Sequence, residues 1–233
     1  MTVQAFRYAL YLVPEQDSLL WQVGSAALGY DAITGESVPQ PVFAGLDPRA
    51  LVRLTDEPRR YGFHMTIKAP FRLAKGFEPE ALVEAARSMA RAHQAVTPGP
   101  LQVKFRRMRG ENEGFLCLEP REIPDALATL ERDVVIGLDR FRAPLTPDDI
   151  ARRSPDRLTL RQRALLDRFG YPFVLDEFRP HFSLTGRTTV NDDLLGALEN
   201  VLVPVLRGPR IRYRLALFTQ NEAGAPFRGV PIV

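Results

Sequence analysis

Hydrophobic and polar positions along the chain follow two periods, and these predict alternating strands and helices. Short runs rich in β-branched and aromatic residues predict strands, and runs with apolar residues every three or four positions predict helices. Capping residues and early prolines indicate where helices begin. The predicted strands are 7–14, 63–70, 101–108, 114–120, 181–186 and 209–220, and the predicted helices begin near Asp17 or Ser18, Asp47, Glu78, Pro124, Thr146, Thr159 and Asn191.

The predicted elements occur twice in the same order. A histidine-bearing strand, a helix and a strand of alternating basic and apolar residues appear first with FHMTIKAP and LQVKFRR, then with HFSLTG and RIRYRLALF. This is a repeat of pattern with little identity. It predicts an α+β fold over residues 1–233, a single bilobal domain. Two pseudo-twofold-related lobes, each an antiparallel sheet with helices packed outside, would surround a central cleft.

A helical, arginine-rich segment at about 141–169 separates the two halves. Thr146 and Thr159 are predicted caps, Pro147 lies in a first turn, and Gly170 follows the second helix. The segment is either a lid over the cleft or a packing element, and the sequence leaves both open.

Composition favours a globular protein with a small anionic ligand. The chain is 45% hydrophobic and 25% charged, both ordinary fractions. Its net charge is +3, and the arginines are scattered or close to acids. A long nucleic-acid track would need a concentrated basic face. A phosphate or another small anion fits this charge better.

The single cysteine and the short apolar runs bear on location. Cys117 excludes an internal disulfide and agrees with a reducing compartment, and GFLCLEP alternates like a buried strand. No signal peptide is visible, and no run approaches the roughly 18 apolar residues that span a membrane. We therefore expect a soluble, cytoplasmic protein without membrane contact. The oligomeric state stays open.

Two of the three histidines stand two residues before a hydroxyl side chain, at corresponding places in the two halves. These are His64 with Thr66 and His181 with Ser183. Positions i and i+2 of a strand share a face, so each motif presents an imidazole beside a hydroxyl. A single such tripeptide arises readily by chance, but the paired occurrence favours catalysis. His93, at the end of a predicted helix, is assigned no chemistry.

Facing pairs of this kind suit displacement at a phosphodiester. One imidazole would take a proton from the attacking water or hydroxyl, and the other would protonate the leaving oxygen. The hydroxyls would bind non-bridging phosphate oxygens. With three histidines and one cysteine at unrelated spacings, no metal site is visible. No metal and no cofactor are expected.

The motifs resemble the LigT-like two-histidine phosphoesterase superfamily, whose pattern is H-x-[ST] twice. ALGYDAITGE, YGFHMTIKAPFRL, LTLRQRALLDRFGYPF and HFSLTGR further resemble its phosphonate-operon-associated branch, over nearly the whole chain. The resemblance implies that His64 and His181 are the acid–base pair, with Thr66 and Ser183 as phosphate ligands. It implies a substrate with a cyclic phosphate or a 2′–5′ phosphodiester, and in a phosphonate pathway a phosphorylated ribose cyclic phosphate.

Three further residues are candidate substrate ligands. Lys68 shares the strand face of His64 and Thr66 by spacing, or else ends the strand in solvent. Tyr8 lines the cleft or packs in the core. Arg142, in FRAPLT, reaches an anionic substrate or is solvated or salt-bridged. Arg106, Arg107 and Arg109 are expected at an exposed hairpin end beside RGENEG.

The leading hypothesis is a metal-independent cyclic phosphodiesterase that acts on a nucleotide or a phosphorylated ribose. One alternative is an enzyme for RNA ends or 2′–5′ linkages, which would need a basic, aromatic surface leading to the cleft. The other is a non-catalytic module that binds a nucleotide or phospho-sugar. Both complete motifs favour an enzyme over that module.

Overall fold

An eight-stranded antiparallel sheet forms the centre of the computed structural model, which describes residues 4–43, 47–108, 111–189, 192–208, 210–230 and 232. The strand order is β10-β9-β1-β4-β7-β6-β5, and β8 pairs with β6. A separate ribbon pairs β2 (Tyr30–Asp31) with β3 (Glu36–Ser37), within a segment predicted partly as loop. The strands of the large sheet are β1 (Arg7–Pro14), β4 (Met65–Phe71), β5 (Leu101–Arg107), β6 (Glu113–Pro120), β7 (Phe182–Ser183), β8 (Thr188–Thr189), β9 (Tyr213–Gln220) and β10 (Arg228–Val230).

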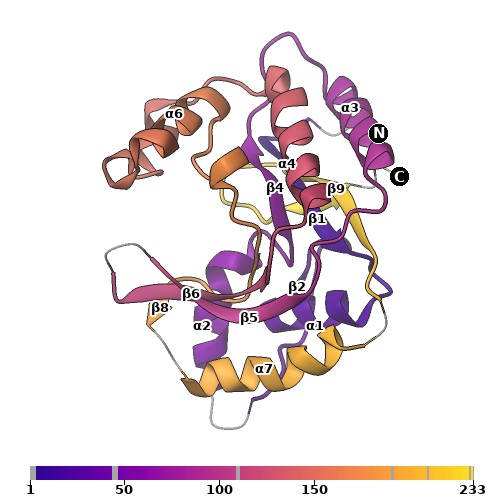
Figure 1. Ribbon diagram of the computed structural model, residues 1–233, viewed down its shortest axis with the longest axis vertical. Coiled ribbons are helices and arrows are strands. Elements are labelled where there is room, and N and C mark those ends of the chain that lie inside the picture. The colour runs from indigo at the N-terminus through magenta and orange to yellow at the C-terminus, as the bar shows by residue number, and fades with distance from the viewer. Residues whose placement is uncertain are drawn as a thin grey trace.

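Helices cover the sheet at both ends of the molecule (Figure 1). α3 packs on β9 and α4 on β4, whereas α7 packs on β5 and α1 on α7. The predicted α+β class, with an antiparallel sheet and helices packed around it, is confirmed. The helices are α1 (Leu19–Leu28), α2 (Pro48–Arg59), α3 (Pro79–Ala92), α4 (Asp125–Gly137), α5 (Pro147–Ala151), α6 (Leu160–Phe169) and α7 (Asp192–Leu206).

The predicted helix caps are present. The Ser18 side chain accepts a hydrogen bond from the Trp21 amide, and Asp47 accepts one from Arg49. Thr146 and Thr159 each complete a capping box. Because each cap satisfies amides that the first helical turn leaves unpaired, local sequence fixes these helix starts.

The chain forms two interleaved repeats. The first repeat runs β1, α1, β4, α3, β5, and the second runs β6, α4, β7, α7, β9. The last strand of each repeat pairs with the first strand of the other, since β5 pairs with β6 and β9 with β1. Equivalent cross-strand pairs are Tyr11–Thr66 and Leu12–Met65 in the first repeat and Cys117–Ser183 and Leu118–Phe182 in the second.

The two strands that follow the histidines, β4 and β7, meet at one residue pair. Met65 of β4 pairs with Phe182 of β7, and these two residues are equivalent positions in the repeats. An approximate twofold axis therefore passes through this pair. Each lobe was expected to hold its own sheet, but β7 hydrogen-bonds to both β4 and β6, so one continuous sheet crosses both lobes.

Alternation assigns side chains to the two faces of the sheet. We call the face that carries Tyr11, Thr66, Cys117 and Ser183 the cleft face. Residues between them turn to the other face, where the helices bury an apolar core. Representative core residues are Leu10, Leu12, Met65, Leu118, Phe182, Leu215 and Leu217.

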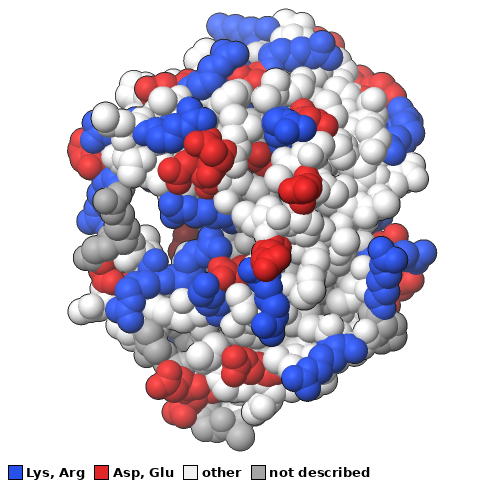
Figure 2. Space-filling model, viewed as in Figure 1, with Lys and Arg blue, Asp and Glu red and all other residues white. Residues whose placement is uncertain are grey.

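The predicted helical insertion contains α5, the 3₁₀-helix η2 (Pro155–Arg157) and α6. It projects from the body at the upper left of Figure 1. Arg157 forms an ion pair with Glu111 beside β6, and Arg187 pairs with both Glu111 and Glu113. Figure 2 shows a hollow on this side of the molecule, with lysine and arginine atoms on both rims. The insertion thus bridges to the β5–β6 hairpin.

No helix in the described part of the chain is both long enough and apolar enough to cross a membrane. The expectation of a cytoplasmic location stays a prediction.

Candidate active site

His64 is held by the turn that precedes β4. Its Nδ1 lies 2.8 Å from the Gly62 carbonyl oxygen, and its Nε2 lies 3.2 Å from Thr66 Oγ1. Gly62 has a φ of 75°, a left-handed conformation that favours glycine. Because a carbonyl can only accept, Nδ1 carries the proton, and the Thr66 hydroxyl donates to Nε2.

His181 is anchored in the same way. Its Nδ1 lies 2.7 Å from the carbonyl oxygen of Arg179, again two residues earlier in the chain. Nε2 is therefore the unprotonated nitrogen of this imidazole too. Ser183 follows two residues later and, by alternation, lies on the same face. The two histidines therefore share the same imidazole tautomer, and their motifs share the same sequence pattern.

Both imidazoles are neutral in the free protein at pH 7. Burial lowers the pKa of His64 to about 4, the Gly62 hydrogen bond opposes this, and a charge on His181 lowers the pKa further. Burial also lowers the pKa of His181 to about 4, with Arg106 lowering and Glu119 raising it. Each histidine directly precedes a residue of the Met65–Phe182 pair, so the two imidazoles start from neighbouring strands of the sheet.

The residue opposite each hydroxyl differs between the motifs. Tyr11 pairs with Thr66, and its ring stacks on His64 with centroids 3.8 Å apart. Cys117 occupies the equivalent position opposite Ser183. The ring that contacts His181 comes instead from Phe115, at 5.2 Å. The side chains around the two imidazoles are therefore different, although the backbone repeats.

A groove of about 560 Å³ opens beside His181 on the cleft face. Glu119 binds Arg106 at 2.5 Å and Lys104 at 2.8 Å. Arg179 also lines the groove, and its guanidinium lies 4.4 Å from the Phe173 ring centroid. Arg106 is therefore half-buried and ion-paired, whereas the sequence predicted an exposed hairpin end. Arg107 is exposed, as predicted. Arg109 lies outside the described residues.

The prediction that Lys68 shares the face of His64 and Thr66 is wrong. Thr66 pairs with Tyr11, but Lys68 pairs with Leu10, the next residue, so β4 carries an extra residue at Ile67. This bulge reverses the alternation. Lys68 is 3% exposed, and its Nζ donates to the Val135 carbonyl in α4 at 3.1 Å. Burial lowers its pKa to about 8, and Asp139 partly offsets this.

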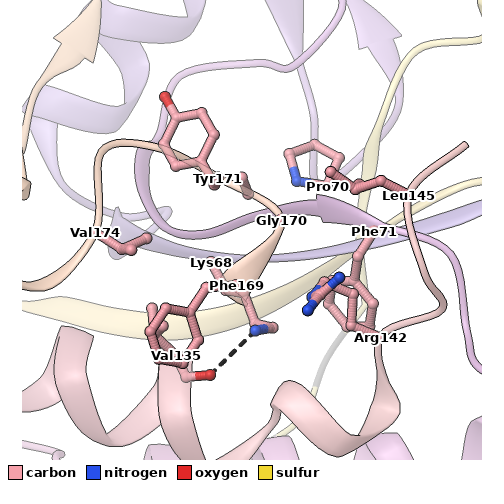
Figure 3. Close-up of a pocket in the computed structure, with 11 residues that line it drawn as sticks. Lys68, Pro70, Phe71, Val135, Arg142, Leu145, Phe169, Gly170, Tyr171 and Val174 are labelled. Atoms are coloured by element: carbon pink, nitrogen blue, oxygen red, sulfur yellow. Dashed lines mark hydrogen bonds between the residues drawn. The ribbon is translucent and has the colours of Figure 1, made fainter. Parts of the chain in front are cut away.

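Arg142 is salt-bridged, the alternative that the sequence left open. Its Nε lies 2.8 Å from Asp139 Oδ1, and its Nη2 donates to the Arg168 carbonyl at 2.9 Å. Lys68 contacts the same carboxylate at 3.5 Å. Figure 3 shows Lys68 and Arg142 lining one small cavity, with Tyr171 above them and its hydroxyl pointing away.

Tyr8 lies in the core and not in the cleft. It is 1% exposed, its ring lies 6.4 Å from that of Phe71, and its hydroxyl accepts a hydrogen bond from the Ala5 amide. It turns to the helix-covered face because it is three residues from Tyr11 on a strand of period two. The placements of Tyr8, Lys68 and Arg142 give no support to a substrate contact.

The cleft face also carries residues that the sequence did not single out. Tyr11 could have been found from its register, since it lies opposite Thr66 as Cys117 lies opposite Ser183. Gly62 could have been found as a glycine two residues before the histidine. Arg153 of the insertion and Tyr171 after it lie outside the sheet, with the guanidinium 4.8 Å from the ring centroid, and they carry no local signal.

His93 caps α3 at its C-terminus, and its Nε2 lies 3.2 Å from Asp133. This is a structural environment, as its position in the sequence predicts. Within the described ranges, no three His, Cys, Asp or Glu side chains gather so that they could hold a metal ion.

Comparison with known proteins places the chain in a family. A family described as "Protein of unknown function (DUF1045)" matches residues 66–228, and no solved structure is significantly similar. Two curated relatives are each called ribose 1,5-bisphosphate phosphokinase PhnN. The protein from Janthinobacterium sp. (strain Marseille) is 39% identical over 227 residues, which cover 95% of this chain and 49% of the relative.

The protein from Laribacter hongkongensis (strain HLHK9) is 33% identical over 232 residues, which cover 95% of this chain and 50% of the relative. The chain therefore spans about half the length of the curated relatives it matches. The family match, in contrast, includes Thr66, His181 and Ser183 and more than half of the chain. The chain belongs to the DUF1045 family.

Proposed function

We propose that this protein is a cyclic phosphodiesterase in which His64 and His181 open a cyclic phosphate on a phosphorylated sugar or nucleotide. The observation that carries the proposal is the matched pair of imidazoles. Each has Nδ1 bound to the carbonyl two residues earlier, which leaves Nε2 as the free base. The Met65–Phe182 pair brings the two motifs together at the approximate twofold axis.

The reaction needs one neutral and one protonated imidazole. The neutral Nε2 takes a proton from water, the water oxygen attacks phosphorus, and the bond from phosphorus to one ring oxygen breaks. The other imidazole gives its Nε2 proton to that leaving oxygen, so that the product is a phosphate monoester. Thr66 and Ser183 donate hydrogen bonds to non-bridging oxygens.

Anion binding allows one imidazole to take up a proton from the solvent. Both imidazoles are neutral at pH 7 in the free protein. A bound phosphodiester places a negative charge beside both and raises the pKa of the one that becomes the acid. Their mutual repulsion favours protonation of only one of the two. The site therefore prepares one acid and one base when the substrate binds.

The relatives' printed name refers to a phosphorylated ribose, which agrees with a phospho-sugar ligand and a role in phosphonate metabolism. The kinase activity in that name need not belong to the half that this chain matches. The sequence contains no G-x-x-x-x-G-K-[ST] phosphate loop. The ion pair of Arg157 with Glu111 joins the insertion to the segment before β6, which supports a small substrate over a long RNA.

The proposal is tested with a panel of nucleoside 2′,3′-cyclic phosphates, ribose cyclic phosphates and 2′–5′ dinucleotides, assayed with and without EDTA. We expect turnover of a cyclic phosphate that EDTA does not reduce, lost in His64→Ala and His181→Ala. Turnover only of 2′–5′ linkages would favour the RNA enzyme. Tight binding without turnover would favour the binding module. Full loss of activity in EDTA would overturn the metal-independent mechanism.

A further inference from the structure

A buried carboxyl group of α4 binds the backbone of the connection that leads to His181. Glu131 is 1% exposed, and the Leu175 amide donates to its Oε1 at 3.1 Å and to its Oε2 at 3.2 Å. Burial raises the pKa of this carboxyl to about 7, which the Leu175 amide and the charge of Lys68 oppose. A carboxyl group is costly to bury. Core packing alone therefore does not account for a glutamate at this position of α4.

Leu175 has a backbone conformation that leucine rarely adopts. Its φ is 55°, in the left-handed region that is unfavourable for a residue with a Cβ. It begins the 3₁₀-helix η3 (Leu175–Glu177), and its carbonyl accepts a hydrogen bond from the Phe178 amide at 3.0 Å. A conformation of this kind persists only where surrounding contacts hold it. The Glu131 carboxyl supplies such a contact, because it binds the amide of the strained residue itself.

The contacts of η3 continue to the carbonyl that orients His181. Gln162 of α6 donates from its Nε2 to the Glu177 carboxylate at 2.9 Å, and the same carboxylate oxygen lies 3.3 Å from Arg179 Nη2. The Arg179 carbonyl in turn accepts the hydrogen bond from His181 Nδ1 at 2.7 Å. A series of contacts therefore links Glu131 through η3 to the group that sets the tautomer of His181.

The first motif obtains its carbonyl anchor from the end of a helix. The Gly62 amide donates to the carbonyls of Pro58 and Arg59 in the last turn of α2, both at 3.2 Å, and the Gly62 carbonyl binds His64. Residues 170–180, all of them described, contain only η3 between α6 and β7. The second motif therefore lacks a helix directly before its carbonyl anchor, and Glu131 reaches this connection from α4.

We propose that Glu131 is a positioning residue of the second motif. By holding Leu175, it keeps the Arg179 carbonyl against Nδ1 of His181, and this leaves Nε2 of that imidazole free for proton transfer. The inference rests on the proposed function and names a residue of α4 on which the acid–base pair depends. Glu131 acts through the backbone and does not contact the substrate. Its loss should disturb His181 and spare His64.

The test determines the tautomer of each imidazole by NMR at pH 7.5. Correlation of the ring protons with Nδ1 and Nε2 shows which nitrogen carries the proton, and the chain has only three histidines to assign. In wild type, His64 and His181 should both be protonated on Nδ1. Glu131→Met keeps the length of the side chain but removes both oxygens, so His181 should become a mixture of tautomers while His64 stays unchanged. Glu131→Gln keeps an acceptor oxygen and should restore the wild-type spectrum.

A second substitution in α4 controls for a general loss of stability. Leu127 lies one helical turn before Glu131 and is 0% exposed. Leu127→Ala leaves a cavity and lowers the free energy of unfolding, but it removes no hydrogen bond to the connection. It should leave both tautomers unchanged. If Leu127→Ala disturbed His181 as much as Glu131→Met does, the positioning role would be overturned in favour of a purely structural one.

Kinetics separate this inference from the proposed function. On a cyclic phosphate, Glu131→Met should lower kcat about tenfold to a hundredfold and leave KM within about twofold, because a proton-transfer group is misplaced while the other substrate contacts remain. If no cyclic phosphate is turned over but Glu131→Met changes the tautomer of His181 alone, the proposed function fails and the positioning role stands. If cyclic phosphates are turned over and Glu131→Met keeps both the wild-type kcat and the wild-type tautomer, the positioning role is overturned.

Discussion

The two histidine motifs have the same backbone but different surroundings. In each, Nδ1 binds the carbonyl two residues earlier, and a hydroxyl follows two residues later. Around His64 the contacts are aromatic, with Tyr11 stacked at 3.8 Å and Tyr61 at 6.2 Å. His181 has one neighbouring ring, Phe115 at 5.2 Å, and the charges of Arg106 and Glu119 also act on its pKa.

The two motifs therefore share the backbone contacts of the imidazole, and they differ in the side chains around it. Two proton-transfer groups need the same tautomer and orientation, which backbone carbonyls and strand register supply. The substrate beside them is not symmetric, so the surrounding side chains have no reason to match. Under the proposed function, the carbonyl anchors position the two proton-transfer groups, whereas the side chains around the imidazoles are free to differ.

The largest expected effect is removal of either imidazole. His64→Ala and His181→Ala should each lower kcat/KM for a cyclic phosphate by a factor of about 10² to 10⁴, because each removes one proton-transfer group. The double variant should lose much less than the product of the two losses, since the groups act together. His93→Ala, at the end of α3, is the matched control and should retain activity. A single variant with near wild-type turnover would contradict the paired assignment.

Removal of the hydroxyls should have the next largest effect. Thr66→Val and Ser183→Ala should lower kcat about tenfold to a hundredfold, somewhat less than loss of an oxyanion-hole donor, since water can partly replace a donor in an open cleft. Thr66→Ser keeps the hydroxyl and should restore most of the activity. The Thr66 hydroxyl also bonds to His64 Nε2. If Thr66→Val and Thr66→Ser were equally active, the hydroxyl would have no role in the reaction.

The pH dependence of stability should show that both half-buried imidazoles are neutral in the folded protein at pH 7. Their folded pKa values of about 4 lie below the unfolded value of about 6.5, so the unfolded chain binds protons first as the pH falls. Stability present above pH 6.5 is therefore lost between pH 6.5 and 4. After discounting for partial exposure, we expect about 1–2 kcal/mol per histidine at pH 4.5.

Urea denaturation at pH 7 and pH 4.5 measures this loss, and the double variant His64→Asn, His181→Asn should lose less stability than wild type. NMR titration adds the ligand effect. Inorganic phosphate should raise the pKa of one imidazole clearly more than that of the other, because the acid and base become distinct only when an anion binds. Two imidazoles that titrate near pH 6.5 in the free protein would contradict the assigned environment.

Local sequence predicted the helix starts and the pairing of the two motifs. Thr146, Thr159, Asp47 and Ser18 cap their helices through contacts within three residues, so no distant element was needed. The repeat could be predicted because the two halves keep the same order of strands and helices and the same hydrophobic periodicity, although few of their residues are identical.

Register and side-chain partners could not be predicted in the same way. The face of Lys68 depends on a bulge at Ile67, which forms only when β4 pairs with β1. Arg142 has an acid three residues earlier in DRFR, and that spacing could have signalled the Asp139 ion pair. Arg153 precedes α6 and Tyr171 follows it, and only the fold stacks the guanidinium on the ring.

The smallest effects are expected at Tyr11 and Cys117, the residues that pair with Thr66 and Ser183. Tyr11→Phe keeps the ring on His64 and removes only a buried hydroxyl that has no hydrogen-bond partner among the described residues, so kcat/KM for a cyclic phosphate should change by no more than about threefold. Cys117→Ser, at the equivalent position, should stay within about twofold, because burial raises the pKa of this thiol to about 12 and leaves it no thiolate for chemistry.

The free energy of unfolding of Tyr11→Phe tests whether the Tyr11 hydroxyl has a structural role. Among the described residues the buried hydroxyl has no hydrogen-bond partner, so its removal should leave the free energy of unfolding unchanged or raise it by up to about 1 kcal/mol. A structural hydroxyl would instead lower stability when removed. Urea denaturation of Tyr11→Phe, set beside its kinetics, decides between the two. A variant that is less stable and equally active would show that Tyr11 supports the fold of the first motif and does not contact the substrate.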